Sequence, residues 1–168
     1  MRHSFSYSSI IFAPREEVWA FYNDTKNINQ ISPRYARVKI ERADVPMRAG
    51  SEIIISTLWP PKMRWHVKVV EYIANHHFID QQVSGPFRFW RHTHLFEPSD
   101  VGTKLTDKVE FTLPPLIHWL TTPIVHLLLK MYFAHRHKMT RNLIESRGVR
   151  RRMPRFQTIS VDRHSLHG

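Results

Sequence analysis

The amino-acid sequence predicts an α+β fold, in which a curved antiparallel sheet wraps around one long C-terminal helix. The first observation behind this prediction is the order of the expected elements: one strand, two short helices, six further strands and a long closing helix. The second is that successive strands are joined by short connections, which favours antiparallel neighbours. The third is size, because 168 residues with 42% hydrophobic content suffice for the core of one domain.

The first strand is predicted over residues 3–12, where aromatic side chains alternate with serines. A helix follows at Pro14, because proline is tolerated in a first helical turn and the two glutamates after it suit the positive end of the helix dipole. Thr25 is expected to cap a second short helix, which the Ser32-Pro33 pair ends.

Six further strands are predicted from alternating hydrophobicity and from the Gly, Pro and Asn turn signals between them. They cover residues 35–43, 51–59, 65–73, 77–83, 89–96 and 103–113. Because each connection is short, the strands are expected to form an antiparallel meander.

The closing helix is predicted from the apolar residues that begin after Pro115. Pro123 is expected either to kink this helix or to start a second one at Thr122, and Gly148 is expected to end it after about Ser146. The predicted domain therefore covers residues 1–147. Residues 148–168, with five Arg and one Asp, are expected to form a basic, flexible tail.

Composition narrows the functional classes. Cysteine is absent, which excludes disulfides, thiolate metal sites and thiol nucleophiles. The N-terminus has no secretory apolar segment, and Pro123 interrupts the longest apolar stretch, so a cytoplasmic location is expected. The net charge of +11 permits attraction to anionic membranes, nucleic acid or acidic ligands. The chain contains no phosphate-binding loop, dinucleotide fingerprint, nucleophile elbow or zinc-protease motif.

The most informative segment lies between Gly85 and Pro114, where two strands and a turn-forming loop predict a hairpin. Its expected pairs on one face are Phe96 with Leu105, His94 with Asp107, His92 with Val109, and Trp90 with Phe111. A carboxylate and two imidazoles on an otherwise apolar face indicate a partly polar interior. We therefore expect a cavity.

Three stretches resemble the START-like (SRPBCC) superfamily, above all its small bacterial members. They are FAPREEVWAFYND, FIDQQVSGPFRFWRHTHLF with GTKLTDKVEFTLP, and MYFAHRHKMTRNLIE. This superfamily shares the helix-grip fold and includes polyketide cyclases, birch-pollen-type allergens, coenzyme Q-binding proteins and steroidogenic lipid carriers. The resemblance implies an apolar cavity between the sheet and the long helix, which holds a hydrophobic small molecule.

The resemblance also implies the residues that line this cavity. The sheet would contribute Phe78, Trp90, His92, His94, Phe96, Leu105, Asp107, Val109 and Phe111. The helix would contribute Ile124, Leu128, Met131 and His135, with Arg136 reaching an acidic group of the ligand. However, Leu127, Leu129 and Phe133 make this helix apolar on nearly all sides, so the sequence leaves open which face meets the sheet. The segment from His135 to Lys138 is otherwise expected on the exposed or polar part of the helix.

Three functions remain open. The preferred one is a carrier that sequesters a lipid, an isoprenoid or a polyketide-like molecule. The second is a cyclase or dehydratase, in which Asp107 holds His94 in one tautomer as a general base. The two side chains could equally do no more than satisfy each other in the interior. The third is an adaptor that binds a membrane surface or a nucleic acid through the basic tail.

Metal binding is the remaining chemistry to weigh. His92 and His94 share one strand face, and Asp107 or Asp80 could act as a third ligand. Two histidines at this spacing are a weak motif, so no metal ligand and no cofactor are assigned. Contact with an anionic membrane stays open as a partner, whereas nucleic acid is disfavoured because the sheet lacks the aromatic and basic strings of an RNA-recognition domain. The oligomeric state is also left open.

Overall fold

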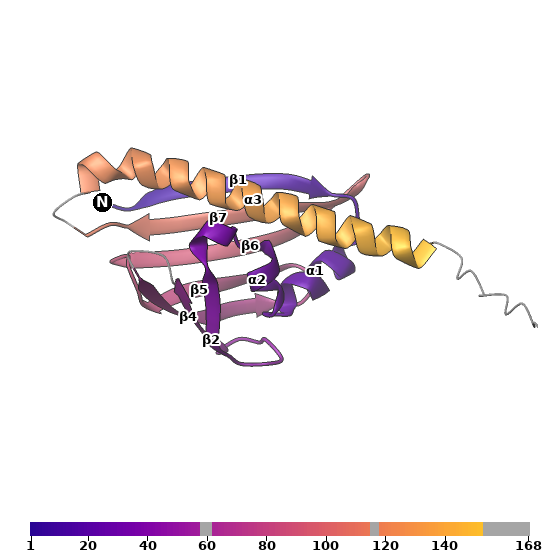
Figure 1. Ribbon diagram of the computed structural model, residues 1–168, viewed down its shortest axis with the longest axis horizontal. Helices are drawn as coiled ribbons and strands as arrows, with labels where there is room; N and C mark the ends of the chain where they lie inside the picture. Colours follow the sequence, from indigo (N-terminus) through magenta and orange to yellow (C-terminus); the bar gives the residue numbers. More distant parts are fainter. Residues whose placement is uncertain (58–61, 115–117, 153–168) are drawn as a thin grey trace, which may run out of the picture.

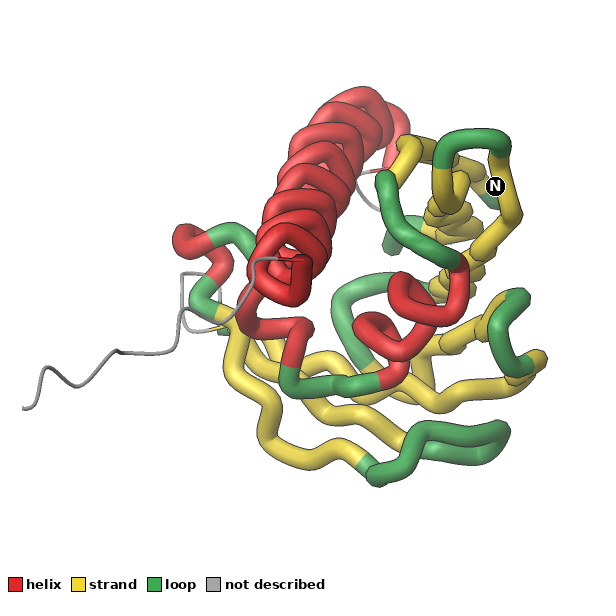
Figure 2. Tube along the Cα trace, turned by 90° about the vertical axis from the view of Figure 1, so that its right-hand side faces the viewer, coloured by secondary structure: helices red, strands yellow, loops and turns green. Residues whose placement is uncertain are grey.

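The computed structural model describes residues 1–57, 62–114 and 118–152. A seven-stranded antiparallel sheet curves around one long helix, α3 (His118–Arg152), as Figures 1 and 2 show. The strands are β1 (His3–Ile11), β2 (Val38–Ala43), β3 (Glu52–Thr57), β4 (Met63–Ile73), β5 (His77–Ser84), β6 (Phe89–Ser99) and β7 (Gly102–Thr112). Their order in the sheet is β1-β7-β6-β5-β4-β3-β2. The predicted α+β fold class is confirmed.

Two short helices, α1 (Arg15–Asn23) and α2 (Asn27–Ile31), follow β1 as predicted, and a 3-10 turn, η1 (Arg34–Ala36), comes after them. They lie inside the curve of the sheet (Figure 2). Trp19 anchors α1, because its ring packs edge-on against Phe78 and Phe96 of the sheet. Thr25 is not the cap of α2. That helix starts after Lys26 without a side-chain cap, and the Lys26 N–H donates to Asp24 Oδ1 instead.

The hairpin of β6 and β7 has the predicted register. All four expected pairs are present: Phe96 with Leu105, His94 with Asp107, His92 with Val109, and Trp90 with Phe111. The strands run further than expected, so that only Asp100 and Val101 form the turn. Gly102 is required after this turn, because its φ is +150° and a Cβ atom would collide with the carbonyl of Ile11 at the end of β1.

Helix α3 is longer than predicted. Pro123 lies inside it rather than at the start of a separate helix, and the helix passes Gly148 and ends at Arg152. The predicted stop at Gly148 was therefore wrong, and of the two alternatives at Pro123 the start of a separate helix was wrong. The predicted boundary between the domain (1–147) and its tail falls within α3. Residues 153–168 of the tail lie outside the described residues.

The phase of α3 differs from the prediction. Ile124, Leu128 and Met131 are 57%, 54% and 53% exposed, so they lie on the helix face turned away from the sheet. The buried face instead carries Leu129, Phe133, Arg136, His137, Thr140 and Ile144. These positions recur at three- and four-residue intervals, as expected for one side of an α-helix. The predicted cavity-lining roles of Leu128 and Met131 are therefore corrected.

The interior divides into two apolar clusters. The first joins α1 and α2 to the sheet and includes Val18, Trp19, Phe78, Phe96, Leu105 and Ile144. The second lies under the N-terminal half of α3 and includes Trp90, Val109, Phe111, Leu113, Leu129 and Phe133. Within the described part of the chain, no helix has the length and apolar character that crossing a membrane requires.

Candidate functional site

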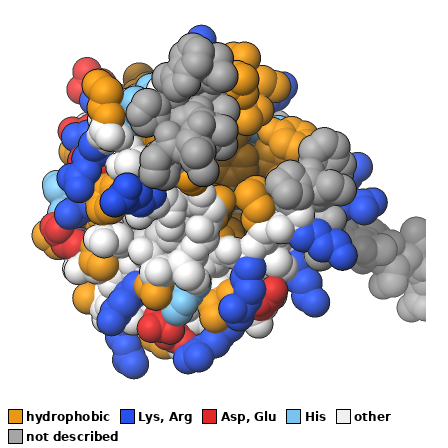
Figure 3. Space-filling view, turned by 90° about the vertical axis from the view of Figure 1, so that its left-hand side faces the viewer, with side chains coloured by type: hydrophobic (Ala, Val, Ile, Leu, Met, Phe, Trp, Pro, Cys, Tyr) orange, Lys and Arg blue, Asp and Glu red, His pale blue; other side chains and the backbone are white. Residues whose placement is uncertain are grey.

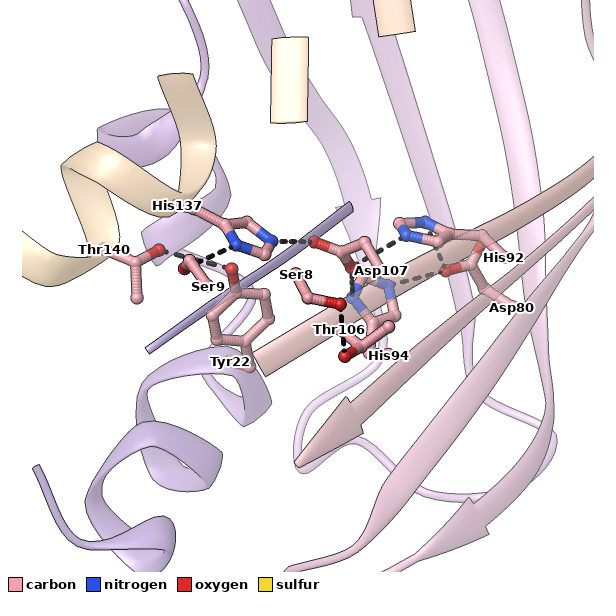
Figure 4. A network of polar contacts seen from close by, with 10 residues as sticks. All are labelled: Ser8, Ser9, Tyr22, Asp80, His92, His94, Thr106, Asp107, His137 and Thr140. Carbon is pink, nitrogen blue, oxygen red and sulfur yellow. Dashed lines mark hydrogen bonds and ion pairs between the residues drawn. The ribbon is translucent and has the colours of Figure 1, made fainter. Parts of the chain in front are cut away.

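A buried polar cluster lies on three neighbouring strands beneath α3 (Figure 4). His92 and His94 come from β6, Asp107 from β7 and Asp80 from β5. In the sheet, Asp80 is paired with His92, and His94 is paired with Asp107. Side chains at a spacing of two share a sheet face, so the strand register alone brings these four groups together.

Asp107 is the centre of the cluster and is fully buried. Its Oδ1 accepts a hydrogen bond from His92 Nε2 at 2.9 Å, and its Oδ2 accepts one from His137 Nε2 at 2.7 Å. His94 Nδ1 also lies 2.7 Å from Oδ1, but it is poorly aligned for a hydrogen bond. The carboxylate is thus enclosed by three imidazoles, which satisfies the desolvated charge.

Asp80 lies on the other side of the same two imidazoles. Its Oδ2 is 3.1 Å from His94 Nε2 and 3.6 Å from His92 Nδ1. The two rings lie with their centroids 3.8 Å apart. Each histidine therefore has one ring nitrogen near Asp107 and the other near Asp80.

His137 connects this cluster to β1, because its Nδ1 lies 2.8 Å from Ser9 Oγ. It is only 1% exposed, which corrects the expectation that it lies on the exposed or polar part of the helix. A spacing of four residues places it on the same helix face as Phe133. Once the buried face of α3 was known, this spacing could have identified His137. The predicted residue His135 is not among the buried residues of α3.

Burial and charge shift the pKa values of the cluster. Burial disfavours the charged form of Asp107, but the charge of His94 and the hydrogen bond from His137 outweigh it and hold the pKa of Asp107 well below its usual value. Burial also opposes the charge on His94, but Asp107 and Asp80 together raise its pKa. For His92, burial and repulsion from His94 prevail and lower the pKa.

Arg136 is a buried cation beside this cluster, with only 9% of its surface exposed. Its guanidinium lies 5.6–5.9 Å from the ring centres of Tyr22, Tyr132 and Phe133. Burial opposes its charge, yet Tyr132, Tyr22 and Asp107 outweigh this effect and raise its pKa. The hydroxyls of Tyr132 and Tyr22 accept hydrogen bonds from the guanidinium, but its Nε hydrogen has no acceptor among the described residues. Such a cation is suited to an anionic partner from outside the chain.

A hydrophobic recess opens at the end of the molecule where α3 begins (Figure 3). The second apolar cluster lies at this end, and Phe5, Trp65, Phe87, Val125 and Tyr132 are its partly buried members. The indole Nε1 of Trp65 is buried there and has no hydrogen-bond partner within residues 1–57, 62–114 and 118–152. Phe133 links this cluster to the polar one, because its ring is 5.1 Å from that of His92.

The predicted sheet residues divide between the two clusters. Trp90, Val109 and Phe111 lie in the second cluster, whereas Phe78, Phe96 and Leu105 belong to the first. Phe78 and Phe96 are covered by Trp19 of α1, so they form packed core rather than the wall of the recess. A separate groove of about 180 Å³ lies between α1 and the end of α3. Its lining includes Glu17, Asp24 and Arg147, which does not suit an apolar ligand.

A curved antiparallel sheet that grips a long C-terminal helix is the architecture of the helix-grip, START-like class of proteins. The chain belongs to the family described as polyketide cyclase / dehydrase and lipid transport, whose model matches residues 2–143. No curated protein matches the chain in sequence.

Solved structures confirm the fold at low sequence identity. The Thermus thermophilus protein TTHA0849 is 19% identical with a TM-score of 0.68, and the match covers 86% of this chain and 99% of that one. A point mutant of norcoclaurine synthase from Thalictrum flavum, in complex with a transition-state analogue, is 12% identical with a TM-score of 0.70, covering 88% and 97%. The di-domain aromatase/cyclase StfQ of the steffimycin pathway is 11% identical with a TM-score of 0.66, covering 89% and 52%.

Proposed function

We propose that this chain binds and carries a hydrophobic small molecule with an acidic end, in the space between the sheet and the N-terminal half of α3. The observation that carries this proposal is the pairing of an apolar recess with buried donors that lack acceptors, namely Trp65 Nε1 and Arg136 Nε. The family, which includes lipid transport, supports the same class of ligand.

Two free-energy terms would drive binding. Removing an alkyl chain from water contributes about 0.8 kcal/mol for each buried methylene group. A buried donor without a partner costs about 1–3 kcal/mol, which an oxygen atom of the ligand would recover. Because Arg136 carries a full charge, a carboxylate suits it better than a hydroxyl does. The ligand would thus place its chain in the second apolar cluster and its acid near Arg136.

The test is a binding measurement with a matched pair of variants on α3. Val125 packs against the second apolar cluster, whereas Leu127 is 58% exposed on the opposite face. Val125→Trp should obstruct the recess and weaken binding of palmitate at least tenfold, while Leu127→Trp should leave binding unchanged. Circular dichroism would verify that both variants are folded. Equal affinities for the two variants would contradict the proposal, as would native mass spectrometry in which the protein takes up no palmitate.

The cyclase or dehydratase alternative has less support. A general base needs a free ring nitrogen, but His94 has one nitrogen against Asp80 and the other against Asp107. Its raised pKa also favours the protonated ring. For a carrier, His94→Gln should change ligand affinity only modestly. For an enzyme, the same change should abolish turnover of a polyketide-like or β-hydroxy substrate while binding survives.

We also propose that an anionic membrane supplies the ligand. The outer face of α3 exposes four large apolar side chains near the recess, Ile124, Leu127, Leu128 and Met131. This patch belongs to a chain with a net charge of +11, which favours anionic surfaces. Replacing Leu127 and Leu128 by Glu should reduce sedimentation with phosphatidylserine vesicles but not the affinity for dissolved palmitate. Unchanged sedimentation would contradict the proposal that the membrane supplies the ligand.

A further inference from the structure

We propose that a divalent transition-metal ion binds between Asp80 Oδ2, His92 Nδ1 and His94 Nε2. Each of the three residues offers a ligand atom, and these atoms lie within 4.8 Å of one another. Asp80 Oδ2 is 3.1 Å from the nitrogen of His94 and 3.6 Å from that of His92. Bonds of about 2.0–2.1 Å in a tetrahedral site put neighbouring ligand atoms about 3.3 Å apart. The two measured separations lie on either side of this value.

Asp107 supplies the support that metal-binding histidines require. Such histidines generally donate their other ring N–H to a carboxylate, which orients the ring and directs the free lone pair at the metal. Here His92 Nε2 donates to Asp107 Oδ1 over 2.9 Å, whereas His94 Nδ1 lies 2.7 Å from the same oxygen but is poorly aligned for a hydrogen bond. On each ring, the nitrogen that faces Asp107 is the one that is not directed at Asp80. His137 in turn holds Asp107 from the helix side.

Electrostatics also call for a cation at this point. His94 Nε2 donates a hydrogen bond to Asp80 Oδ2 over 3.1 Å, and His92 Nδ1 faces the same oxygen at 3.6 Å. Bound to a metal ion, both nitrogens would instead present lone pairs. Three electron-rich atoms in a buried site repel one another unless a positive charge lies among them. A metal ion held by all three atoms would supply that charge.

The donor set indicates which metals would bind. Two imidazoles and one carboxylate suit Zn²⁺ and Fe²⁺, whereas Ca²⁺ and Mg²⁺ prefer oxygen ligands alone. Three protein ligands leave one position open for water or for an oxygen atom of a ligand. The rings of Trp90 and Phe133 lie 6.0 and 5.1 Å from that of His92, so this site adjoins the second apolar cluster. The inference does not depend on the proposed carrier function.

The sequence assigned no metal ligand, because two histidines on one strand are common. The structure adds the position of Asp80, which is paired with His92 and diagonal to His94. Two further imidazoles lie together on the surface and could attract a metal ion nonspecifically: His77 Nε2 lies 2.7 Å from Glu71 Oε1, and His76 is next to it. The experiment must therefore distinguish the buried group from this exposed one.

The experiment uses the full chain, stripped of metal with a chelator and then titrated with Zn²⁺ and with Co²⁺. We expect one tight Zn²⁺ per chain by native mass spectrometry and the intense visible absorption of four- or five-coordinate Co²⁺. Asp80→Asn should abolish this absorption, and Asp107→Asn should weaken Zn²⁺ binding about 10- to 100-fold. The control variant, His76→Gln with His77→Gln, should retain both signals. Circular dichroism of the metal-free variants would establish that each is folded.

A second measurement keeps the proposal falsifiable if Asp80→Asn does not fold. On adding Zn²⁺ to the unaltered protein, the ¹⁵N signals of His92 Nδ1 and His94 Nε2 should shift. Shifts confined to His76 and His77 would overturn the proposal, and so would loss of binding in the surface double variant alone. Six-coordinate cobalt in every variant would likewise show that the buried groups form a hydrogen-bond network without a metal.

Discussion

His137 on α3 donates a hydrogen bond from its Nε2 to Asp107 on β7 over 2.7 Å, at a point where both side chains are buried. This bond joins the closing helix to the middle of the sheet. Because Asp107 also accepts a hydrogen bond from His92, a single carboxylate couples β6, β7 and α3. The stability and the binding properties of the protein should both depend on this connection.

The first prediction concerns the charge of Asp107. Asp107→Asn removes the anion from among three imidazoles, so we expect it to lower the free energy of unfolding by about 3–5 kcal/mol. The measurement is urea denaturation at neutral pH. Asp100→Asn, in the exposed β6–β7 turn, is the control and should change stability by less than about 0.5 kcal/mol. For Asp107→Asn, a measured loss of less than about 1 kcal/mol would fall well short of the expected range. Such a result would contradict the central role of this carboxylate.

The second prediction tests the phase of α3 with two neighbouring leucines. Leu129 is 8% exposed in the second apolar cluster, whereas its neighbour Leu128 is more than half exposed. Truncating a buried leucine loses burial and leaves a cavity, so Leu129→Ala should cost about 2–5 kcal/mol. Leu128→Ala should cost less than about 1 kcal/mol. Thermal and urea unfolding of both variants would show the difference, and equal losses would mean that the helix is rotated.

A third prediction concerns the acidic end of the ligand. Arg136→Met retains a long apolar side chain but removes the cation. A charge-assisted hydrogen bond contributes about 1.5–3 kcal/mol, so the affinity for palmitate should fall about 10- to 100-fold. Affinity for hexadecanol, which carries no charge, should change much less. Competition against a fluorescent fatty-acid probe measures both values. An equal loss for acid and alcohol would show that Arg136 does not recognise the charge.

The fourth prediction is a pH dependence at Asp44, far from the candidate site. The backbone N–H of Glu52 donates to its Oδ2 over 3.0 Å, and together with Arg42 this bond lowers the pKa of Asp44 below its ordinary value of 3.8. A lowered carboxyl pKa contributes stability above the unfolded pKa, and that contribution is lost as the pH falls through the folded pKa. The free energy of unfolding of the unaltered protein should exceed that of the Asp44→Asn variant at pH 6, and this difference should shrink as the pH falls to 3. A constant difference over this range would refute the assignment.

The sequence predicted the β6–β7 hairpin correctly down to its residue pairs. Alternation and turn chemistry act over a few residues, so a strand's two faces and its register with the next strand are encoded locally. The same reasoning placed His92, His94 and Asp107 on the inner face, where the structure has them. Asp80 was recognised as a candidate ligand, but only the order of the strands puts it beside His92.

The remaining members of the site come from other elements, and the local pattern could not place them. Tyr22 comes from α1, whereas His137 and Thr140 come from α3. The hydroxyl oxygens of Tyr22 and Thr140 lie 3.3 Å apart and link the two helices. The sequence around His137 is polar and reads as exposed, yet the residue is buried because α3 crosses the polar cluster at that point.

The sequence by itself determined the fold class, the strand pairs and the presence of ionisable groups on an apolar sheet face, because side-chain periodicity is a short-range property of the chain. The tertiary structure decided which side of α3 is buried, where that helix ends and which histidine reaches Asp107. A helix with apolar residues on nearly all sides can pack in several orientations of similar hydrophobicity. Only the surface of the sheet, with its buried carboxylate in need of donors, selects one of them.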